Sequence, residues 1–183
     1  MPDVAGILVG GRALRMGGMA KGLLTTSSGE TLVARWRRLF DELGSPCWLV
    51  GQHEAYADMD IECLSDDPPH IGPLGGLIAL LSRAGDGRAI AVACDMPFVS
   101  LELLRKLASY PSGAPVVAPR RGRLWEPLFA RYEAPRVIAA ARERALSGEH
   151  ALQGLLDDLG TDPLPLDASE LDQLRDWDRP EDR

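Results

Sequence analysis

The amino-terminal segment combines an apolar run with a dense group of glycines. Residues 3–9 are mostly apolar and predict a buried strand, which runs directly into the glycine-rich residues 10–22. Glycine lets the backbone turn sharply and approach a ligand closely, because it has no Cβ. Successive N–H groups in such a loop can point into one concavity that suits an anion. Because Arg15 and Lys21 add positive charge there, the segment indicates a polyphosphate-binding loop.

Two common phosphate-binding motifs do not fit this segment. A Walker A loop needs a hydroxyl residue directly after its lysine, whereas Gly22 follows Lys21. The dinucleotide fingerprint needs separated glycines, whereas Gly10 and Gly11 are adjacent. The alternative interpretation is a glycine-rich surface turn with two solvated cations. The position of the loop directly after the first apolar strand favours ligand binding over that alternative.

Apolar runs alternate with helical patterns along the chain, which predicts an α/β fold with a mostly parallel central sheet. The nearly pure apolar run at 89–93 is typical of a central parallel strand covered on both faces. Gly44 is suited to end one helix and Ser100 to cap another. We expect residues 1–183 to form a single domain. The expected strands are 3–9, 47–50, 61–64, 89–93, 115–118, 125–132 and 161–166, and the expected helices are 31–43, 73–83, 101–108, 135–146 and 149–159. An arginine-glycine turn at 120–123 is expected to join the strands 115–118 and 125–132.

Composition limits the classes of partner. The net charge is −7, and an acidic chain without a basic face is not expected to bind nucleic acid. No apolar run is long enough for a membrane span, and the start of the chain lacks the pattern of a signal peptide. Three cysteines, Cys47, Cys63 and Cys94, form no CxxC pair, which favours a reduced, cytoplasmic protein over a disulfide scaffold or a zinc site.

Two acidic positions follow predicted strands. Asp66 comes after the strand at 61–64, and Asp95 after the strand at 89–93. In open α/β sheets, ligands bind beyond the carboxyl ends of the strands, where the strand order reverses. Magnesium prefers few carboxylates together with phosphate oxygens, so Asp95 beside a phosphate loop is a candidate metal ligand. The alternatives are a helix-capping role for Asp95 and a turn role for Asp66.

Small residues at 72–76 open a predicted helix. The amide groups at its start could face a nucleotide, or its glycines could allow close packing on the sheet, and the sequence leaves both possibilities open. No Ser-His-Asp, Cys-His or H-E-x-x-H pattern is recognisable, and His70 in the preceding loop receives no catalytic role.

Five motifs in order carry a resemblance to a known family. They are L-V-G-G-x-x-x-R-M-G-G-x-x-K at 8–21, G-P-L-x-G at 72–76, C-D-M-P-F at 94–98, E-P-L-F-A-x-Y at 126–132 and D-W-D-R-P-E-D at 176–182. Together they resemble the molybdenum cofactor guanylyltransferases, the MobA-like nucleotidyltransferases. The resemblance implies a three-layer, Rossmann-like sandwich of the nucleotide-diphospho-sugar transferase type. It also implies transfer of GMP from GTP to the terminal phosphate of molybdopterin, which yields the guanine dinucleotide cofactor and pyrophosphate.

The resemblance also implies roles for individual residues. Nucleotide binding would fall to seven positions: Leu8, Val9, Gly10, Gly11, Lys21, Asp66 and Asp95. The catalytic residues would be Lys21, Arg15 and Asp95, and Asp95 would bind Mg²⁺. The small-molecule partners would be GTP and molybdopterin, and the implied protein partners are molybdoenzyme apoproteins or other cofactor-synthesis proteins. Trp125 and Tyr132 are assigned to core packing rather than to stacking on the pterin.

Several positions depart from the family pattern. Val9 replaces the usual alanine, Ala20 the usual aspartate, and Asp176 and Asp178 two asparagines of the tail. The tail carboxylates could repel the acceptor phosphate or help to hold a second metal. Adjacent glycines after the first strand favour GTP over CTP. The alternatives are a related nucleotidyltransferase that uses CTP or a sugar phosphate, and a catalytically inactive nucleotide-binding module.

Overall fold

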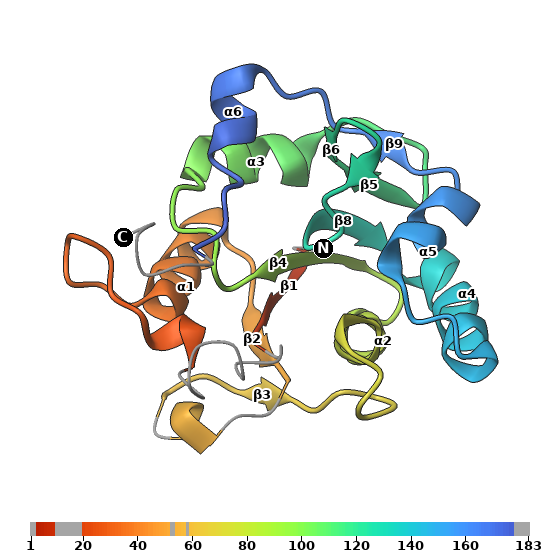
Figure 1. Ribbon diagram of the computed structural model, residues 1–183, viewed down its shortest axis with the longest axis horizontal. Coiled ribbons are helices and arrows are strands. Elements are labelled where there is room, and N and C mark those ends of the chain that lie inside the picture. The colour runs from red at the N-terminus through yellow and green to blue at the C-terminus, as the bar shows by residue number, and fades with distance from the viewer. Residues whose placement is uncertain (1–2, 10–19, 52–53, 58, 178–183) are drawn as a thin grey trace.

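A central sheet of seven strands organises the computed structural model, which describes residues 3–9, 20–51, 54–57 and 59–177 (Figure 1). The spatial order of the strands is β3-β2-β1-β4-β8-β5-β9. Their bounds are β1 Val4–Leu8, β2 Cys47–Val50, β3 Cys63–Leu64, β4 Arg88–Ala93, β5 Val116–Ala118, β8 Phe129–Glu133 and β9 Asp162–Pro163.

The first four strands of this sheet are parallel. β1 pairs with β2 on one side and with β4 on the other, and β2 pairs with β3. β8 runs antiparallel to both β4 and β5, while β9 is parallel to β5. The chain therefore builds outward from β1 in one direction and then returns to its other side, so the strand order reverses between β1 and β4.

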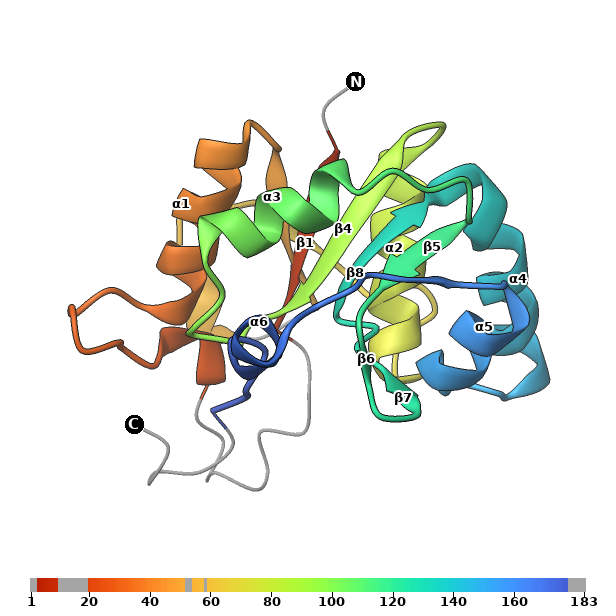
Figure 2. The same ribbon diagram turned by 90° about the horizontal axis from the view of Figure 1, so that it is seen from above.

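Alternate residues of the strands face the two helical layers. Ala5 and Ile7 belong to the core beneath α1 (Leu32–Leu43) and α3 (Leu101–Ser109). Leu8 belongs to the core beneath α2 (Pro73–Ala84), α4 (Ala134–Ser147) and α5 (Leu152–Asp158). Figure 2 shows these two groups of helices on opposite sides of the sheet. The predicted α/β sandwich with a mostly parallel sheet is confirmed.

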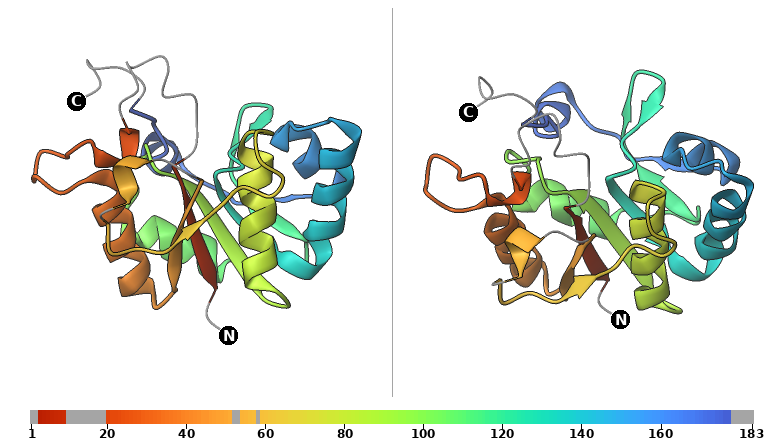
Figure 3. Two further views of the ribbon diagram at one scale, coloured as in Figure 1. Left: turned by 90° about the horizontal axis from the view of Figure 1, so that it is seen from below. Right: turned by 60° about the horizontal axis from the view of Figure 1, so that its bottom comes forward.

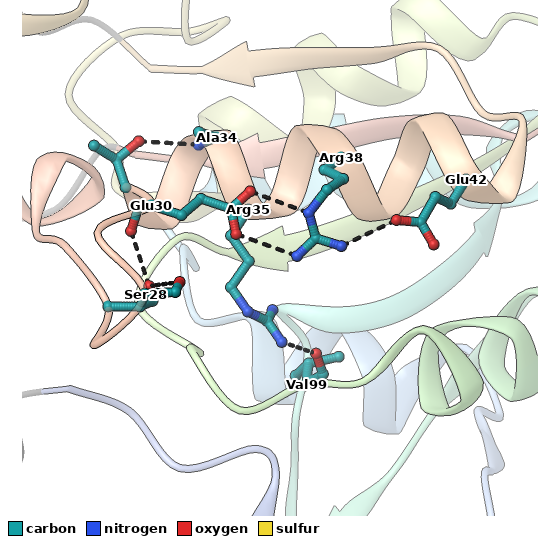
Figure 4. Close-up of polar contacts among 9 residues, drawn as sticks. Ser28, Glu30, Ala34, Arg35, Arg38, Glu42 and Val99 are labelled. Carbon is teal, nitrogen blue, oxygen red and sulfur yellow. Dashed lines mark hydrogen bonds and ion pairs between the residues drawn. The ribbon is translucent and has the colours of Figure 1, made fainter.

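The helix boundaries follow local signals, of which the end of α1 at Gly44 and the cap of α3 at Ser100 match the expectation. Thr31 caps α1 by accepting a hydrogen bond from the Ala34 N–H, and Gly44 ends it in the left-handed conformation at φ 77°. Ser100 caps α3 by accepting from the Leu103 N–H. α1 is also tied to the segment before α3, because Arg35 Nη2 donates to the Val99 carbonyl at 2.5 Å (Figure 4). Burial lowers the pKa of the Arg35 guanidinium.

Residues 115–132 differ from the prediction. The arginine-glycine turn belongs to a separate two-stranded hairpin, β6 (Arg120–Arg121) and β7 (Leu124–Trp125), which Figure 3 shows projecting from the sheet. β8 therefore begins only at Phe129. Trp125 is bonded to α5 instead of to the sheet: its indole Nε1 donates to Asp157 at 2.8 Å, and its backbone exchanges hydrogen bonds with the Gln153 side chain.

Two further differences concern short elements. β3 covers only Cys63–Leu64 of the expected 61–64, and β9 only Asp162–Pro163 of the expected 161–166. A short helix, α6 (Ala168–Asp172), is absent from the predicted elements. It begins with a capping box: the Asp167 side chain accepts from the Glu170 N–H, and the Glu170 side chain accepts from the Asp167 N–H. Among the described residues, no helix has the length and apolar character that crossing a bilayer requires.

Candidate active site

The carboxyl ends of the four parallel strands meet along one edge of the sheet. The Val9 N–H donates to the Val50 carbonyl at 3.0 Å, and the Cys94 N–H donates to the Leu8 carbonyl at 3.2 Å. The Gly51 N–H donates to the Leu64 carbonyl at 2.9 Å. Residues that follow these strands are thus held side by side, at the point where the strand order reverses and where open α/β sheets bind ligands.

Lys21 and Asp95 contact each other directly at this edge. Lys21 Nζ lies 2.8 Å from Asp95 Oδ2, although the residues are 74 positions apart in the chain. The two side chains remain 26% and 17% exposed, so a ligand can still reach them. The structure therefore brings the lysine of the glycine-rich segment and the strand-end aspartate together, and their roles in binding stay predictions. Gly10, Gly11 and Arg15 lie outside the described residues.

The turn that carries Lys21 is held in place by Tyr56. Lys21 opens η2 (Lys21–Leu23), and the Gly22 N–H donates to the Tyr56 hydroxyl at 3.0 Å. A Cβ on Gly22 would lie 2.6 Å from Val33 Cγ2 and 2.8 Å from that hydroxyl, so only glycine fits here. Burial raises the pKa of Tyr56 to about 12, which keeps its hydroxyl neutral. Tyr56 was not singled out from the sequence, because nothing local marks it as a partner of Gly22.

The loop that carries Asp95 is held through its backbone. The Asp95 carbonyl accepts from the Trp177 N–H at 2.9 Å, and the neighbouring Cys94 is buried. Burial first, and then the charge of Asp95, raise the pKa of Cys94 to about 12, so this thiol stays protonated. The charge of Asp176 adds the smallest contribution to the same rise in the pKa of Cys94. Asp178, the other tail carboxylate, lies outside the described residues.

Asp66 lies at the same edge of the sheet, next to the start of α2. β2 and β1 stand between β3 and β4, so the ends of the outer pair are about 14 Å apart at a strand spacing of about 4.8 Å. Burial raises the pKa of the Asp66 carboxyl, and His70 partly opposes this shift. The Lys21–Asp95 pair lies beyond the end of β4, so the strand order separates Asp66 from it along this edge.

The glycines at the start of α2 serve close packing. A Cβ on Gly75 would lie 2.4 Å from the Pro68 carbonyl oxygen. A Cβ on Gly76 would lie 2.8 Å from Val50 Cγ1 and 3.2 Å from Asp66 Oδ1. Of the two possibilities that the sequence left open for this segment, these contacts support tight packing of the helix on the sheet. The same contacts hold the Asp66 carboxylate close to the helix start.

The remaining predicted nucleotide contacts lie at the end of β1. Leu8 is buried and Val9 is half-buried, and both take part in the backbone bonds that join the strand ends. Trp125 and Tyr132 are buried, and the Tyr132 hydroxyl donates to the Pro127 carbonyl at 2.6 Å, so the assignment of both rings to the core is confirmed.

The described residues do not form a preassembled metal cage. Across 3–9, 20–51, 54–57 and 59–177, no group of three or more histidine, cysteine, aspartate and glutamate side chains could hold a metal ion. Asp95 offers one carboxylate beside a lysine. Mg²⁺ commonly binds through one or two carboxylates and takes its other ligands from phosphates and water, so a single carboxylate meets its minimum requirement.

Comparison with known proteins gives a consistent result. Residues 5–162 match the family described as the MobA-like NTP transferase domain. A molybdenum cofactor guanylyltransferase from Pseudomonas putida is 38% identical over 158 residues, which cover 82% of this chain and 80% of that protein. A protein of the same name from Pseudomonas syringae is 35% identical over 173 residues, covering 90% of this chain and 83% of its own length.

Solved structures share the fold. Molybdopterin-guanine dinucleotide biosynthesis protein A from Archaeoglobus fulgidus superposes with a TM-score of 0.78 at 24% identity, over 97% of this chain and 93% of the other. The 2-C-methyl-D-erythritol 4-phosphate cytidylyltransferase from Thermus thermophilus gives a TM-score of 0.74 at 15% identity, over 100% and 95% of the two chains. At these identities the likeness concerns the fold alone.

Proposed function

The chain belongs to the MobA-like NTP transferase family, and from this premise we propose that it transfers GMP from GTP to the terminal phosphate of molybdopterin. The observation that carries the proposal is the contact between Lys21 and Asp95 at the point where the strand order reverses. The relatives named molybdenum cofactor guanylyltransferase support GTP as the donor and molybdopterin as the acceptor.

The proposed reaction exchanges one phosphorus–oxygen bond for another. An oxygen of the terminal phosphate of molybdopterin attacks the α-phosphorus of GTP. The bond from that phosphorus to the oxygen shared with the β-phosphate breaks, and pyrophosphate leaves with the electron pair. Because the attacking oxygen is already deprotonated, the site needs charge neutralisation and alignment more than a strong base.

Each site residue has a proposed part in this reaction. Lys21 would leave Asp95 and bind the triphosphate, where its charge stabilises the transition state. Asp95 would hold Mg²⁺, and the ion when bound would supply further positive charge to the phosphates. Asp66 would contact the nucleotide, and Leu8 and Val9 would border the guanine. Arg15, Gly10 and Gly11 keep the roles that the resemblance implies, as proposals.

The proposed setting is the cytoplasm, and it is supported by Cys47, Cys63 and Cys94, which are all free thiols. The likeness to a cytidylyltransferase does not favour CTP, because it extends to the fold alone.

Pyrophosphate release tests the proposal directly. The purified chain with Mg²⁺, GTP and molybdopterin is expected to release pyrophosphate and to form the guanine dinucleotide product, and CTP at equal concentration is expected to compete poorly. Release with CTP in preference to GTP would replace the donor. Nucleotide binding without release from any nucleotide, unchanged in Asp95→Asn, would instead identify an inactive binding module.

A further inference from the structure

The C-terminal segment, residues 164–177, crosses the molecule to reach the candidate site. It leaves β9, forms α6 and passes beside α3 toward the end of β4 (Figures 1 and 2). Lys106 of α3 contacts Glu170 at 2.7 Å, and the Ser100 N–H donates to the Gln173 side chain at 2.9 Å. This segment follows residues 5–162, the part that matches the family domain.

Trp177, the last described residue of this segment, contacts both the chain that follows Lys21 and the loop that carries Asp95. Its backbone N–H donates to the Asp95 carbonyl at 2.9 Å. Trp177 is 6% exposed as a whole residue and forms a small apolar cluster with Leu24 and Leu32. The ring also meets Phe98 edge to face, with centroids 6.3 Å apart, so the loop after β4 contacts Trp177 through backbone and side chain alike.

One apolar partner of Trp177, Leu24, ends the turn that carries Lys21, and the other, Leu32, opens α1. The Leu24 N–H donates to the Lys21 carbonyl at 3.0 Å, and the Leu32 N–H donates to the Leu24 carbonyl at 3.0 Å. The indole therefore packs on Leu24, which is hydrogen-bonded to Lys21, while the backbone N–H of Trp177 donates to the Asp95 carbonyl. One residue thus joins the two segments whose charged side chains meet at 2.8 Å.

We propose that Trp177 is a positioning residue, which holds the turn of Lys21 and the loop of Asp95 beside each other, so that both side chains are in place when the triphosphate binds. The proposal rests on the proposed function of this site. Trp177 would act through its indole, because the packing of the ring on Leu24 and Leu32 fixes the position from which the Trp177 N–H donates to the Asp95 carbonyl. Misplacement of a catalytic group by about 1 Å can cost about 100-fold in rate.

The unpartnered indole nitrogen provides a conservative variant. Trp177 Nε1 is buried and has no hydrogen-bond partner among the residues that the structure describes. Phenylalanine at this position would therefore lose ring area without breaking a hydrogen bond of the indole. Trp177→Phe is expected to keep most of the activity that Trp177→Ala loses.

Trp48 offers a matched control. It is a buried tryptophan of β2, 7% exposed, whose Nε1 donates to Glu62 at 2.8 Å and whose ring lies under Arg83, at the end of α2 away from its start. Trp48→Ala removes a comparable side chain without touching either segment of the site. It is expected to lower the melting temperature while leaving the KM for GTP unchanged.

The test measures kcat and KM for GTP by pyrophosphate release, together with the melting temperature. For Trp177→Ala we expect kcat/KM to fall about 100-fold, with a higher KM, because Lys21 contacts the triphosphate before and during transfer. Partial unfolding would lower the apparent kcat alone. An unchanged KM in Trp177→Ala, with a loss of kcat that follows the melting temperature as in Trp48→Ala, would overturn the proposal.

Crystal structures separate this inference from the proposed function. If the wild-type chain releases no pyrophosphate from any nucleotide, the proposed function fails, and the positions of Lys21 and Asp95 alone decide about Trp177. A longer Nζ–Oδ2 separation in Trp177→Ala than in the wild type supports the positioning role. The same separation in both chains refutes it.

Discussion

Replacing Lys21 by methionine tests the electrostatic core of the site. The exchange keeps most of the side-chain volume and removes the charge that lies 2.8 Å from Asp95. At that distance, Coulomb attraction amounts to about 6 kcal/mol at an effective dielectric constant of about 20, before the cost of desolvation is subtracted. Breaking a buried ion pair by removing one partner costs about 3–5 kcal/mol. Because both of these side chains are partly exposed, we expect the free energy of unfolding to fall by less than that.

The effect on turnover is expected to be larger than the effect on stability. Loss of one preorganised charge contact to the transition state lowers kcat by about 100-fold to 1,000-fold, or about 2.7–4 kcal/mol. The assay is steady-state pyrophosphate release at saturating GTP and molybdopterin. Arg88→Met is the control, because Arg88 forms an ion pair of 2.7 Å with the buried Asp3 at the opposite end of β4 and β1. It is expected to lower stability and leave kcat unchanged. A loss of less than about tenfold in Lys21→Met, which is about 1.4 kcal/mol, would refute the role of this charge in transfer.

Three other outcomes follow from the same structure. Asp95→Asn is expected to abolish metal-dependent turnover while the protein stays folded, and undiminished pyrophosphate release would show that this carboxylate is not the metal ligand. Burial raises the pKa of the Asp66 carboxyl, and the charge of His70 offsets this rise only in part. Ionisation of Asp66 therefore lowers the free energy of unfolding, and this loss of stability grows as pH rises through the folded-state pKa. Asp66→Asn should therefore melt above the wild type at pH 7, and this gain should disappear below the ordinary aspartate pKa of 3.8; equal melting temperatures at both pH values would contradict it. Because burial raises the pKa of Cys94 to about 12, iodoacetamide at pH 8 should label the exposed Cys63 and spare Cys94 in the folded chain, as peptide mass spectrometry would report; early labelling of Cys94 would show that its loop opens.

Local elements followed from the sequence because their causes are local. A helix needs a cap, an apolar stripe and a residue that ends it, and Thr31 and Gly44 provide two of these for α1 within a few positions. A central parallel strand needs a continuous apolar run, which residues 89–93 provide before Asp95. The placement of Asp95 at the edge where ligands bind followed from that run and from the general geometry of parallel sheets.

The tertiary structure decided what depends on partners distant in the chain. That Lys21 meets Asp95, that Tyr56 receives the Gly22 N–H and that Trp177 holds the Asp95 carbonyl are contacts across 74, 34 and 82 positions. No pattern near any of these residues names its partner, because the partner is set by the strand order and by which side chains fill the space between layers. The sequence by itself therefore predicted which residues are candidates for the chemistry, and the folded arrangement decided which of them lie together, because contacts between distant positions depend on the strand order and on the packing between layers.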